Sequence, residues 1–452
     1  MMDYKNKQIV VLGLAKSGTT VAKLLHKLGA KIVVNDVKPE DQCKEKRELE
    51  SLGIKVICGS HPDDLITSET DLVIKNPGIP YHIPPIQQAL SLRIPVITEV
   101  EVAYQLAKAP FIGITGSNGK TTTTALIGEI LKHAHFRPIV AGNIGTVVCE
   151  QAILAEENQV LVTELSSFQL KGTEQFRPKI GLLLNIYQAH LDYHQTMEDY
   201  IAAKARMFFN QTPDDFAVLN ADCEECVKLI PSIKSQVYLF STKHEVVRGA
   251  YAHKGMIYWK DQGMIEPVLS VHELSLKGVH NLENVLAALT ASRLFGADFK
   301  TIREVLKDFK GVEHRLEYVR TTPNHVSYYN DSKATNPTAT ITALKSFPQK
   351  VILIAGGLDR GIDFQELIEP FRQHVKQLIL FGQTAEKLAK IAQIAGLDQI
   401  YTVDNVDSAV KLADRIAVSG DVVLLSPACA SWDMFSSFEE RGRMFKEAVH
   451  KI

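Results

Sequence analysis

Residues 109–124 read Ala-Pro-Phe-Ile-Gly-Ile-Thr-Gly-Ser-Asn-Gly-Lys-Thr-Thr-Thr-Thr, and this stretch decides the fold of the central part of the chain. Its apolar run at 111–114 predicts a short strand, followed by a glycine-rich turn and then a helix. In that order, backbone amides can converge on phosphate oxygens at a helix N-terminus. The strict phosphate-loop pattern has glycine at position 114, where this chain has Ile114 between Gly113 and Gly116. We interpret the stretch as a nucleoside triphosphate site rather than an ordinary turn.

The loop pattern also predicts chemical roles for two side chains. Lys120 is expected to reach the outer phosphates of the nucleotide, and the hydroxyl of Thr121 to ligate Mg²⁺. Further along, the apolar run 159–164 ends in Glu164, and a carboxylate beside a phosphate loop suits a magnesium ligand better than it suits an ordinary strand end. The residues of the loop that we expect to bind ATP are Gly116, Ser117, Asn118, Gly119, Lys120, Thr121 and Thr122.

Composition limits the remaining possibilities. A chain of 452 residues predicts about three domains, and a formal net charge of −2 favours neither a nucleic-acid nor an anionic-membrane partner. No apolar run approaches the roughly 20 residues of a membrane span, so we expect a cytoplasmic protein. Of the six cysteines only Cys223 and Cys226 have the spacing of a metal or redox pair, and we interpret them as free thiols.

The first hundred residues have the layout of a dinucleotide-binding fold. A buried-strand pattern at 8–14 contains Gly13, a helix is expected from Thr19 to Leu28, and a second strand at 31–36 ends in Asp36. The middle glycine of the fingerprint is replaced by Ala15, so a Rossmann-like nucleotide site is predicted without NAD being required as its ligand. Another strand ends at Asn76, on the sheet edge where such folds bind ligands.

The last part of the chain predicts a second doubly wound sheet. Strand-like runs at 326–330, 350–355, 377–381, 400–403 and 421–425 alternate with helix-like segments. The loops 331–337, 356–361 and 426–433 follow the carboxyl ends of strands, where ligands are expected.

The pattern alone does not decide the role of several further residues. The helix expected after Met197 has Tyr200 and Lys204 one turn apart, and on pattern alone Lys204 would be a solvated lysine and His190 an ordinary loop histidine. Asn281 and Asn284 lie near the start of another predicted helix and share one face of it.

Taken together, these motifs resemble the Mur ligases, ATP-dependent amide-forming enzymes of peptidoglycan precursor synthesis. The segments that carry the resemblance lie in the family's order at 115–122, 164–167, 190 with 204, 280–284, 314–315 and 330–336. Segments 426–433 and 438–442 are similar to those of the D-glutamate-adding member, and the Asp-Asn-Pro-Arg motif of the diaminopimelate- or lysine-adding member is absent from the sequence. The fold implied is α/β in three domains: an N-terminal Rossmann-like domain at 1–98, a central P-loop ATP-binding domain at 99–311 and a C-terminal Rossmann-like domain at 312–452.

The resemblance assigns roles to individual residues. It implies two Mg²⁺ ions held by Thr121, Glu164, His190 and a Lys204 that is carbamylated by carbon dioxide, and these residues with Lys120 form the catalytic set. Besides the loop, ATP would contact Asn281, Asn284, Arg315 and Asp331. The UDP-linked substrate would contact Leu14, Ala15, Lys16, Ser17, Asp36, Asn76, Asn143, Ser166 and Gln169. D-Glutamate would contact Lys333, Arg360, Ser431 and Phe438.

The implied reaction adds D-glutamate to UDP-N-acetylmuramoyl-L-alanine through an acyl phosphate, and we expect a monomer without nucleic-acid or membrane partners. Three alternatives are weighed against it. A folylpolyglutamate synthase shares the central domain but lacks a Rossmann-like domain ahead of the phosphate loop. A nicotinamide-dependent dehydrogenase is disfavoured by Ala15 and by the ATP site. A non-catalytic nucleotide sensor is disfavoured because it needs no second metal site.

Overall fold

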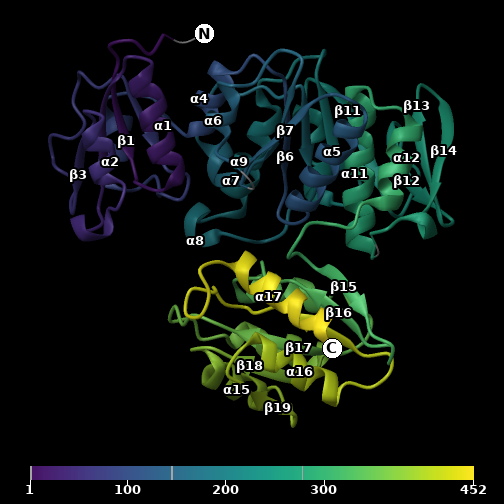
Figure 1. The fold of residues 1–452 in the computed structure, drawn as a ribbon. Helices are drawn as coiled ribbons and strands as arrows, with labels where there is room; N and C mark the ends of the chain where they lie inside the picture. The colour runs from purple at the N-terminus through teal and green to yellow at the C-terminus, as the bar shows by residue number, and fades with distance from the viewer. Residues whose placement is uncertain (1–2, 144–145, 277) are drawn as a thin grey trace. The chain divides into compact units, whose positions relative to one another are not determined.

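The computed structural model describes residues 3–143, 146–276 and 278–452. The chain divides into two compact units, Met1–Phe309 and Lys310–Ile452. Figure 1 shows mixed α/β architecture throughout, and three sheets are formed by the described residues. The predicted α/β class is therefore confirmed, whereas the division into three domains at residues 98 and 311 stays a prediction. No helix within the described ranges is long and apolar enough to cross a membrane.

The first sheet is parallel, with strand order β3-β2-β1-β4-β5. Its strands are β1 Gln8–Leu12, β2 Lys31–Asp36, β3 Lys55–Cys58, β4 Leu72–Lys75 and β5 Val96–Ile97, and its helices include α1 Lys16–Lys27, α2 Lys46–Ser51 and α3 Pro84–Ser91. Helix α1 begins at Lys16 and not at Thr19 as predicted, because the amide of Thr19 already donates to the carbonyl of Ala15 at 3.0 Å. The predicted turn residues Lys16 and Ser17 therefore lie in the first turn of this helix.

Helix α1 can approach β1 closely because of Gly18. A Cβ atom at that position would lie 2.0 Å from the carbonyl oxygen of Gly13. Gly18 therefore has a packing role in the turn, which agrees with the third glycine of a dinucleotide-binding fingerprint.

The second sheet has nine strands among the described residues, in the order β14-β13-β12-β11-β10-β9-β6-β8-β7. Its strands are β6 Phe111–Thr115, β7 Pro138–Gly142, β8 Val160–Glu164, β9 Ile180–Leu183, β10 Phe216–Asn220, β11 Gln236–Ser241, β12 Gly249–His253, β13 Met256–Asp261 and β14 Met264–Ser270. The helices around it are α4 Glu99–Leu106, α5 Lys120–His133, α6 Val148–Ala152, α7 Ser167–Lys171, α8 Leu191–His194, α9 Met197–Phe209, α10 Glu224–Val227, α11 Val279–Phe295 and α12 Phe299–Asp308.

Strand β6 lies between β8 and β9 and is buried along its whole length. Its continuous apolar run suits a parallel strand that is covered on both faces. Because β6, β8 and β9 are parallel, their carboxyl ends meet at one edge, and the phosphate-loop stretch, Glu164 and the segment after Leu183 all start there.

The third sheet, within the second unit, has the order β15-β16-β20-β17-β18-β19. Its strands are β15 Glu317–Thr321, β16 Ser327–Asn330, β17 Val351–Gly356, β18 Val375–Phe381, β19 Ile400–Thr402 and β20 Val422–Leu425, and its helices are α13 Pro337–Leu344, α14 Ile368–His374, α15 Ala385–Ile394, α16 Val406–Ile416 and α17 Phe438–Lys451. Strand β15 was not predicted. It is an antiparallel edge strand with no fully buried residue, so it lacks the apolar run by which the other strands were recognised.

Candidate active site

The phosphate loop is shaped by two glycines with positive φ angles, Gly116 at 155° and Gly119 at 83°. A Cβ at Gly119 would lie 2.2 Å from Oδ1 of Asn284, which comes from α11. Glycine is therefore required here both by backbone conformation and by space. The side chain of Thr123 donates to the same Asn284 oxygen at 3.3 Å, so Asn284 contacts both the loop and helix α5.

Asn185, which was not predicted as a site residue, holds the phosphate loop through two hydrogen bonds. The Oδ1 atom of Asn185 accepts from the amide of Asn118 at 2.8 Å, and its carbonyl accepts from the amide of Ser117 at 3.0 Å. Asn185 lies two residues after the end of β9, so its place after an apolar strand was the available signal. The Ser117 hydroxyl lies 2.9 Å from the hydroxyl of Tyr200 on α9.

Thr121 and Glu164 meet as the resemblance implied. The hydroxyl of Thr121 donates to Oε2 of Glu164 at 2.8 Å, and Nδ2 of Asn143 donates to Oε1 at 3.3 Å. Hydroxyl and carboxylate oxygens side by side at a phosphate loop are the hard ligands that Mg²⁺ prefers. These residues therefore fit a magnesium ion.

Lys120 and Lys204 converge on one carbonyl. The Nζ atoms of the two lysines donate to the oxygen of Gly116 at 2.8 and 2.9 Å. Lys204 is only 1% exposed and its Nζ lies 4.6 Å from the centre of the Tyr200 ring. Its burial, together with the charge of Lys120, holds the pKa of Lys204 well below its usual range. The pattern-only interpretation of a solvated lysine is therefore wrong.

His190 lines the same cavity as the two lysines, and its ring contacts two aromatic side chains. It has a positive φ angle of 57° as the N-cap of α8, and its ring centre lies 4.9 Å from that of Phe168 and 6.3 Å from that of Tyr200. A neighbouring histidine, His194, is held by Asp199 at 2.7 Å and by Ser167 at 2.9 Å. The segment that contains His190 is thus anchored at its other end.

A cavity of about 460 Å³ connects these groups with the turns of the first sheet. It gathers predicted residues from well-separated parts of the sequence, namely Ala15, Lys16, Ser17, Asn76, Gly116, Lys120, Asn143, Ser166, Gln169, His190 and Lys204. Glu99 and Phe168 also line it and were not predicted. Burial raises the pKa of Glu99 to about 7, while the amide of Cys149 donates to its carboxyl at 3.1 Å.

Leu14 and Asp36 are not among the residues that line this cavity. The carboxylate of Asp36 accepts from the amide of Leu14 at 2.8 Å and from that of Lys38 at 2.9 Å. Asp36 therefore shapes the first turn, and its contact with a ribose stays a prediction. Similarly, Ser166 and Gln169 form a capping box at the start of α7, which fixes their orientation at the cavity wall.

Asn281 and Asn284 lie together, as their spacing predicts. Nδ2 of Asn284 donates to Oδ1 of Asn281 at 3.4 Å near the start of α11. The two Asn side chains are thereby joined beside Gly119 of the loop.

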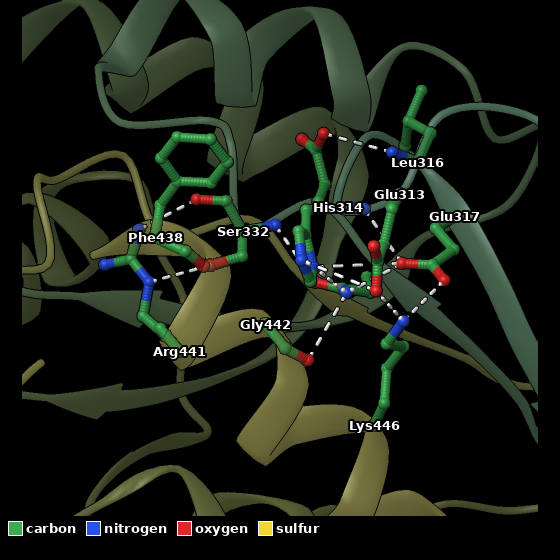
Figure 2. Close-up of polar contacts among 11 residues, drawn as sticks. Glu313, His314, Leu316, Glu317, Ser332, Phe438, Arg441, Gly442 and Lys446 are labelled. Carbon is green, nitrogen blue, oxygen red and sulfur yellow. Dashed lines mark hydrogen bonds and ion pairs between the residues drawn. The ribbon is translucent and has the colours of Figure 1, made fainter. Parts of the chain in front are cut away.

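The second unit holds the remaining predicted residues, and Figure 2 shows one of them, Phe438, whose carbonyl accepts from the hydroxyl of Ser332. Asp331 is buried, with Oδ1 accepting from the amide of Leu316 at 3.1 Å and Oδ2 from the hydroxyl of Ser426 at 2.8 Å. Burial raises the pKa of Asp331 to about 7. Asp331 therefore anchors the segment that contains Arg315.

Two of the predicted D-glutamate contacts lie together, and the other two are linked through a tryptophan. Nζ of Lys333 lies 5.9 Å from the centre of the Phe438 ring. The guanidinium of Arg360 lies 4.7 Å from the ring of Trp432, which follows the buried Ser431. The geometry therefore places one positive charge beside Phe438 and another beside the 426–433 loop.

No cluster of three or more His, Cys, Asp or Glu side chains that could hold a metal occurs in the described part of the chain. The candidate magnesium ligands include only two residues of these types, Glu164 and His190. Cys223 and Cys226 are both free thiols and buried, as expected from the sequence.

Comparison with known proteins decides the family. Family models match residues 7–98 as a Mur ligase MurD-like N-terminal domain, 114–292 as a Mur ligase middle domain and 314–429 as a Mur ligase glutamate ligase domain. The chain belongs to the Mur ligase family. It is 54% identical over 450 residues to the UDP-N-acetylmuramoylalanine–D-glutamate ligase of Geobacillus sp. (strain WCH70), covering 99% of this chain and 98% of that protein. With the Bacillus mycoides (strain KBAB4) protein of the same description it shares 53% identity, covering 100% and 99% of the two chains.

Solved structures agree on the Mur ligase fold. UDP-N-acetylmuramate-alanine ligase MurC from Thermotoga maritima superimposes with a TM-score of 0.57 at 20% identity, covering 98% of this chain and 99% of that chain. The MurF ligase from the same organism gives 0.55 at 17% identity and covers all of both chains. Folylpolyglutamate synthase from Mycobacterium tuberculosis gives 0.56 at 15% identity, covering 77% of this chain and 93% of that chain. At such identities these likenesses concern the fold alone.

Proposed function

We propose that this Mur ligase joins D-glutamate to UDP-N-acetylmuramoyl-L-alanine with cleavage of ATP to ADP and phosphate, in peptidoglycan precursor synthesis. The observation that carries the proposal is the single cavity in which the phosphate-loop lysine, Lys204 and His190 meet the turns of the first sheet. The description of relatives that are 53–54% identical over nearly the whole chain supports the choice of substrates.

The reaction proceeds in two steps. The alanyl carboxylate attacks the γ-phosphorus of ATP, a P–O bond forms, and the bond to the leaving ADP breaks. The amine of D-glutamate then attacks the carbonyl of the acyl phosphate, and phosphate leaves as the amide forms and the amine loses a proton. Lys120 offsets the negative charge that is shared among the phosphate oxygens during transfer. The glycine-rich turn supplies backbone amides that orient the same oxygens.

Mur ligases use ATP and Mg²⁺, and the residues at the loop fit that ion. Thr121 and Glu164 would hold one Mg²⁺, since their oxygens lie 2.8 Å apart. We propose that His190 and a carbamylated Lys204 would hold a second. A bound Mg²⁺ would withdraw charge from the phosphate oxygens that it contacts.

Lys204 has the properties that carbamate formation requires. Carbon dioxide reacts with a neutral amine, and a buried lysine with a lowered pKa is neutral more often than a solvated one. The neutral amine and carbon dioxide give the carbamate anion and one proton, and the ammonium has released another proton beforehand. Overall a cation becomes an anion with oxygen ligands. That anion would also offset the charge of Lys120, whose Nζ shares the Gly116 carbonyl with Lys204.

The remaining assignments follow from the same function. ATP would also contact Asn281, Asn284, Arg315 and Asp331. The turns of the first sheet would hold the UDP-linked substrate. D-Glutamate would contact Lys333, Arg360, Ser431 and Phe438, and its two carboxylates would be stabilised by the two cationic side chains of this set. We propose a cytoplasmic, monomeric enzyme with no nucleic-acid or membrane partner.

The test is phosphate release from ATP in the presence of UDP-N-acetylmuramoyl-L-alanine, with D-glutamate, L-glutamate, L-lysine or diaminopimelate added one at a time. We expect release with D-glutamate alone. Release with another amino acid would keep the ligase chemistry but refute the assigned specificity. If none of the four supports release, the proposed substrates are wrong, and folate substrates and then nucleotide binding without turnover should be tested.

A further inference from the structure

Lys75, the last residue of β4, is a buried lysine that the reaction described above does not use. It is 1% exposed, and burial together with the nearby charge of Lys171 lowers its pKa to about 7. A buried ammonium is costly unless its three donors are satisfied. The contacts that satisfy Lys75 therefore indicate what it holds in place.

The Nζ atom of Lys75 joins two parts of the first unit. It donates to the carbonyl of Pro77 at 2.8 Å, to that of Asn76 at 3.3 Å and to the hydroxyl of Tyr193 at 3.1 Å. Asn76 and Pro77 belong to the turn after β4, whereas Tyr193 lies on α8, which follows the second sheet's strand β9. One ammonium thus contacts elements 118 residues apart in the chain.

Two aromatic rings enclose this ammonium. Nζ lies 5.0 Å from the centre of the Tyr81 ring and 5.6 Å from that of Tyr193, within the range of cation–π attraction. Lys171 lies over the same two rings at 5.2 and 5.8 Å, but it pairs with Asp199 at 2.7 Å. Among the described residues no ion pair is formed by Lys75, so its charge is stabilised by carbonyls, a hydroxyl and ring faces.

Both ends of this contact reach the candidate active site. Asn76, Pro77 and Gly78 line the cavity, and Nδ2 of Asn76 donates to Oγ of Ser17 at 3.3 Å. At the other end, the Phe168 ring lies 4.5 Å from Tyr193 and 4.9 Å from His190. The ammonium therefore lies between the turn assigned to the UDP-linked substrate and the segment that carries His190.

We propose that Lys75 is a positioning residue that holds the Asn76–Gly78 turn against α8. It thereby fixes the position of the binding site for the UDP-linked substrate relative to His190. This rests on the proposed function, because the turn is assigned to that substrate. Lys75 acts through the two backbone carbonyls and through Tyr193.

The test compares the Michaelis constants of Lys75→Met with those of the wild type. Methionine keeps most of the buried volume but removes all donors. Loss of the hydrogen bonds from Lys75 to the turn should raise the KM for UDP-N-acetylmuramoyl-L-alanine about tenfold. The KM values for ATP and D-glutamate should stay within about twofold, because their assigned sites do not include the turn. Calorimetric binding of the UDP-linked substrate without ATP should weaken by the same factor.

Two variants separate positioning from a general loss of stability. Tyr193→Phe keeps the ring and removes the hydroxyl, which accepts from Lys75 at 3.1 Å and donates to the carbonyl of Ile79 at 3.4 Å, so it should raise the same KM about threefold. It should have less effect in a Lys75→Met background, since one of the two partners of this hydroxyl is already gone. Lys7→Met is the matched control, because Lys7 precedes β1 of the same sheet but pairs with Asp71 at the surface.

The outcomes distinguish this inference from the function on which it rests. Unchanged or uniformly raised KM values in Lys75→Met, or additive effects in the double variant, would overturn the positioning role in an active enzyme. If Lys75→Met does not fold, the Tyr193→Phe result decides: a KM change confined to the UDP-linked substrate supports the role, and none refutes it. A wild type that neither binds this substrate nor turns over would instead refute the proposed function.

Discussion

Lys204 combines burial with a second ammonium at the same carbonyl oxygen. Its Nζ has contacts with the Gly116 carbonyl and the Tyr200 ring, neither of which neutralises a cation. A lysine in this setting is poorly stabilised as an ammonium. Conversion to an anionic carbamate, as proposed above, would remove the repulsion from Lys120 and supply oxygen ligands.

We therefore expect Lys204→Ala to reduce turnover at least about a hundredfold, as loss of a group that orients phosphoryl transfer would. High bicarbonate cannot rebuild the carbamate without the amine, but a short carboxylic acid should partly restore turnover by occupying the vacated space. The measurement is phosphate release with and without formate or acetate. An alanine variant of wild-type activity would contradict the carbamate assignment.

Glu99 lies at the cavity wall and should make stability depend on pH. Its folded pKa is about 7, above the ordinary value of 4.5, so the folded state retains the proton to higher pH. Its contribution to stability is therefore fully present below pH 4.5 and lost as pH rises through about 7. Between pH 5 and 8 the Tm of the wild type should fall more than that of Glu99→Gln.

The control for Glu99 is Glu157→Gln, a change of an exposed carboxyl in the loop between α6 and β8. This variant should keep the pH dependence of the wild type. If Glu99→Gln and wild type show parallel Tm profiles, the carboxyl of Glu99 is ionised in the folded protein throughout this pH range.

At the scale of elements, helix α17 organises the loops of the second unit. Arg441 is fully buried and donates to Oγ of Ser332 at 3.0 Å and to the carbonyl of Cys429 at 3.1 Å, beside the loops that carry Lys333 and Ser431. The next residue, Gly442, packs against the His314 ring, as Figure 2 shows. One turn of this helix therefore supports the segments assigned to both D-glutamate and ATP.

Gly442→Ala tests this packing. A Cβ there would lie 2.2 Å from Nδ1 of His314, and the ring cannot move freely because Nδ2 of Asn330 contacts the same nitrogen at 2.9 Å. We expect a net loss of about 1–3 kcal/mol in stability despite the better helix propensity of alanine. Thermal and urea unfolding measure it, and the KM for ATP should rise because Arg315 follows His314.

The matched control on the same helix is Glu447→Ala, at an exposed position. Its effect on stability should stay within about 0.5 kcal/mol. Equal Tm values for Gly442→Ala and the wild type would show that His314 is not held against this turn.

At the scale of the whole molecule, the two compact units have separate apolar cores. The clusters of the first unit draw on residues between Tyr4 and Leu306, and those of the second on residues between Val326 and Val449. Because each unit buries its own core, each should fold as an independent polypeptide.

We expect a fragment of residues 1–309 to fold and to bind ATP with Mg²⁺, since it contains the phosphate loop, Thr121 and Glu164. It should form no amide, because Lys333, Ser431 and Phe438 belong to the other fragment, 310–452. Circular dichroism checks folding, calorimetric titration checks ATP binding, and an assay of the amide product with all three substrates checks the loss of ligation. Loss of cooperative unfolding in either fragment would show that its core depends on the other unit.

The sequence by itself determined the α/β class, the phosphate loop, the carboxylate at the end of β8 and the family, because apolar strand runs and glycine spacing are local patterns. Only the tertiary structure decided the environment of Lys75, Glu99, Asn185 and Lys204. Burial and hydrogen-bond partners depend on segments far apart in the chain, and a lysine on a helix has the same local pattern in water as in a cavity. The contact of the Asn76 turn with α8 through Lys75 is an example, because no spacing in the sequence predicts it.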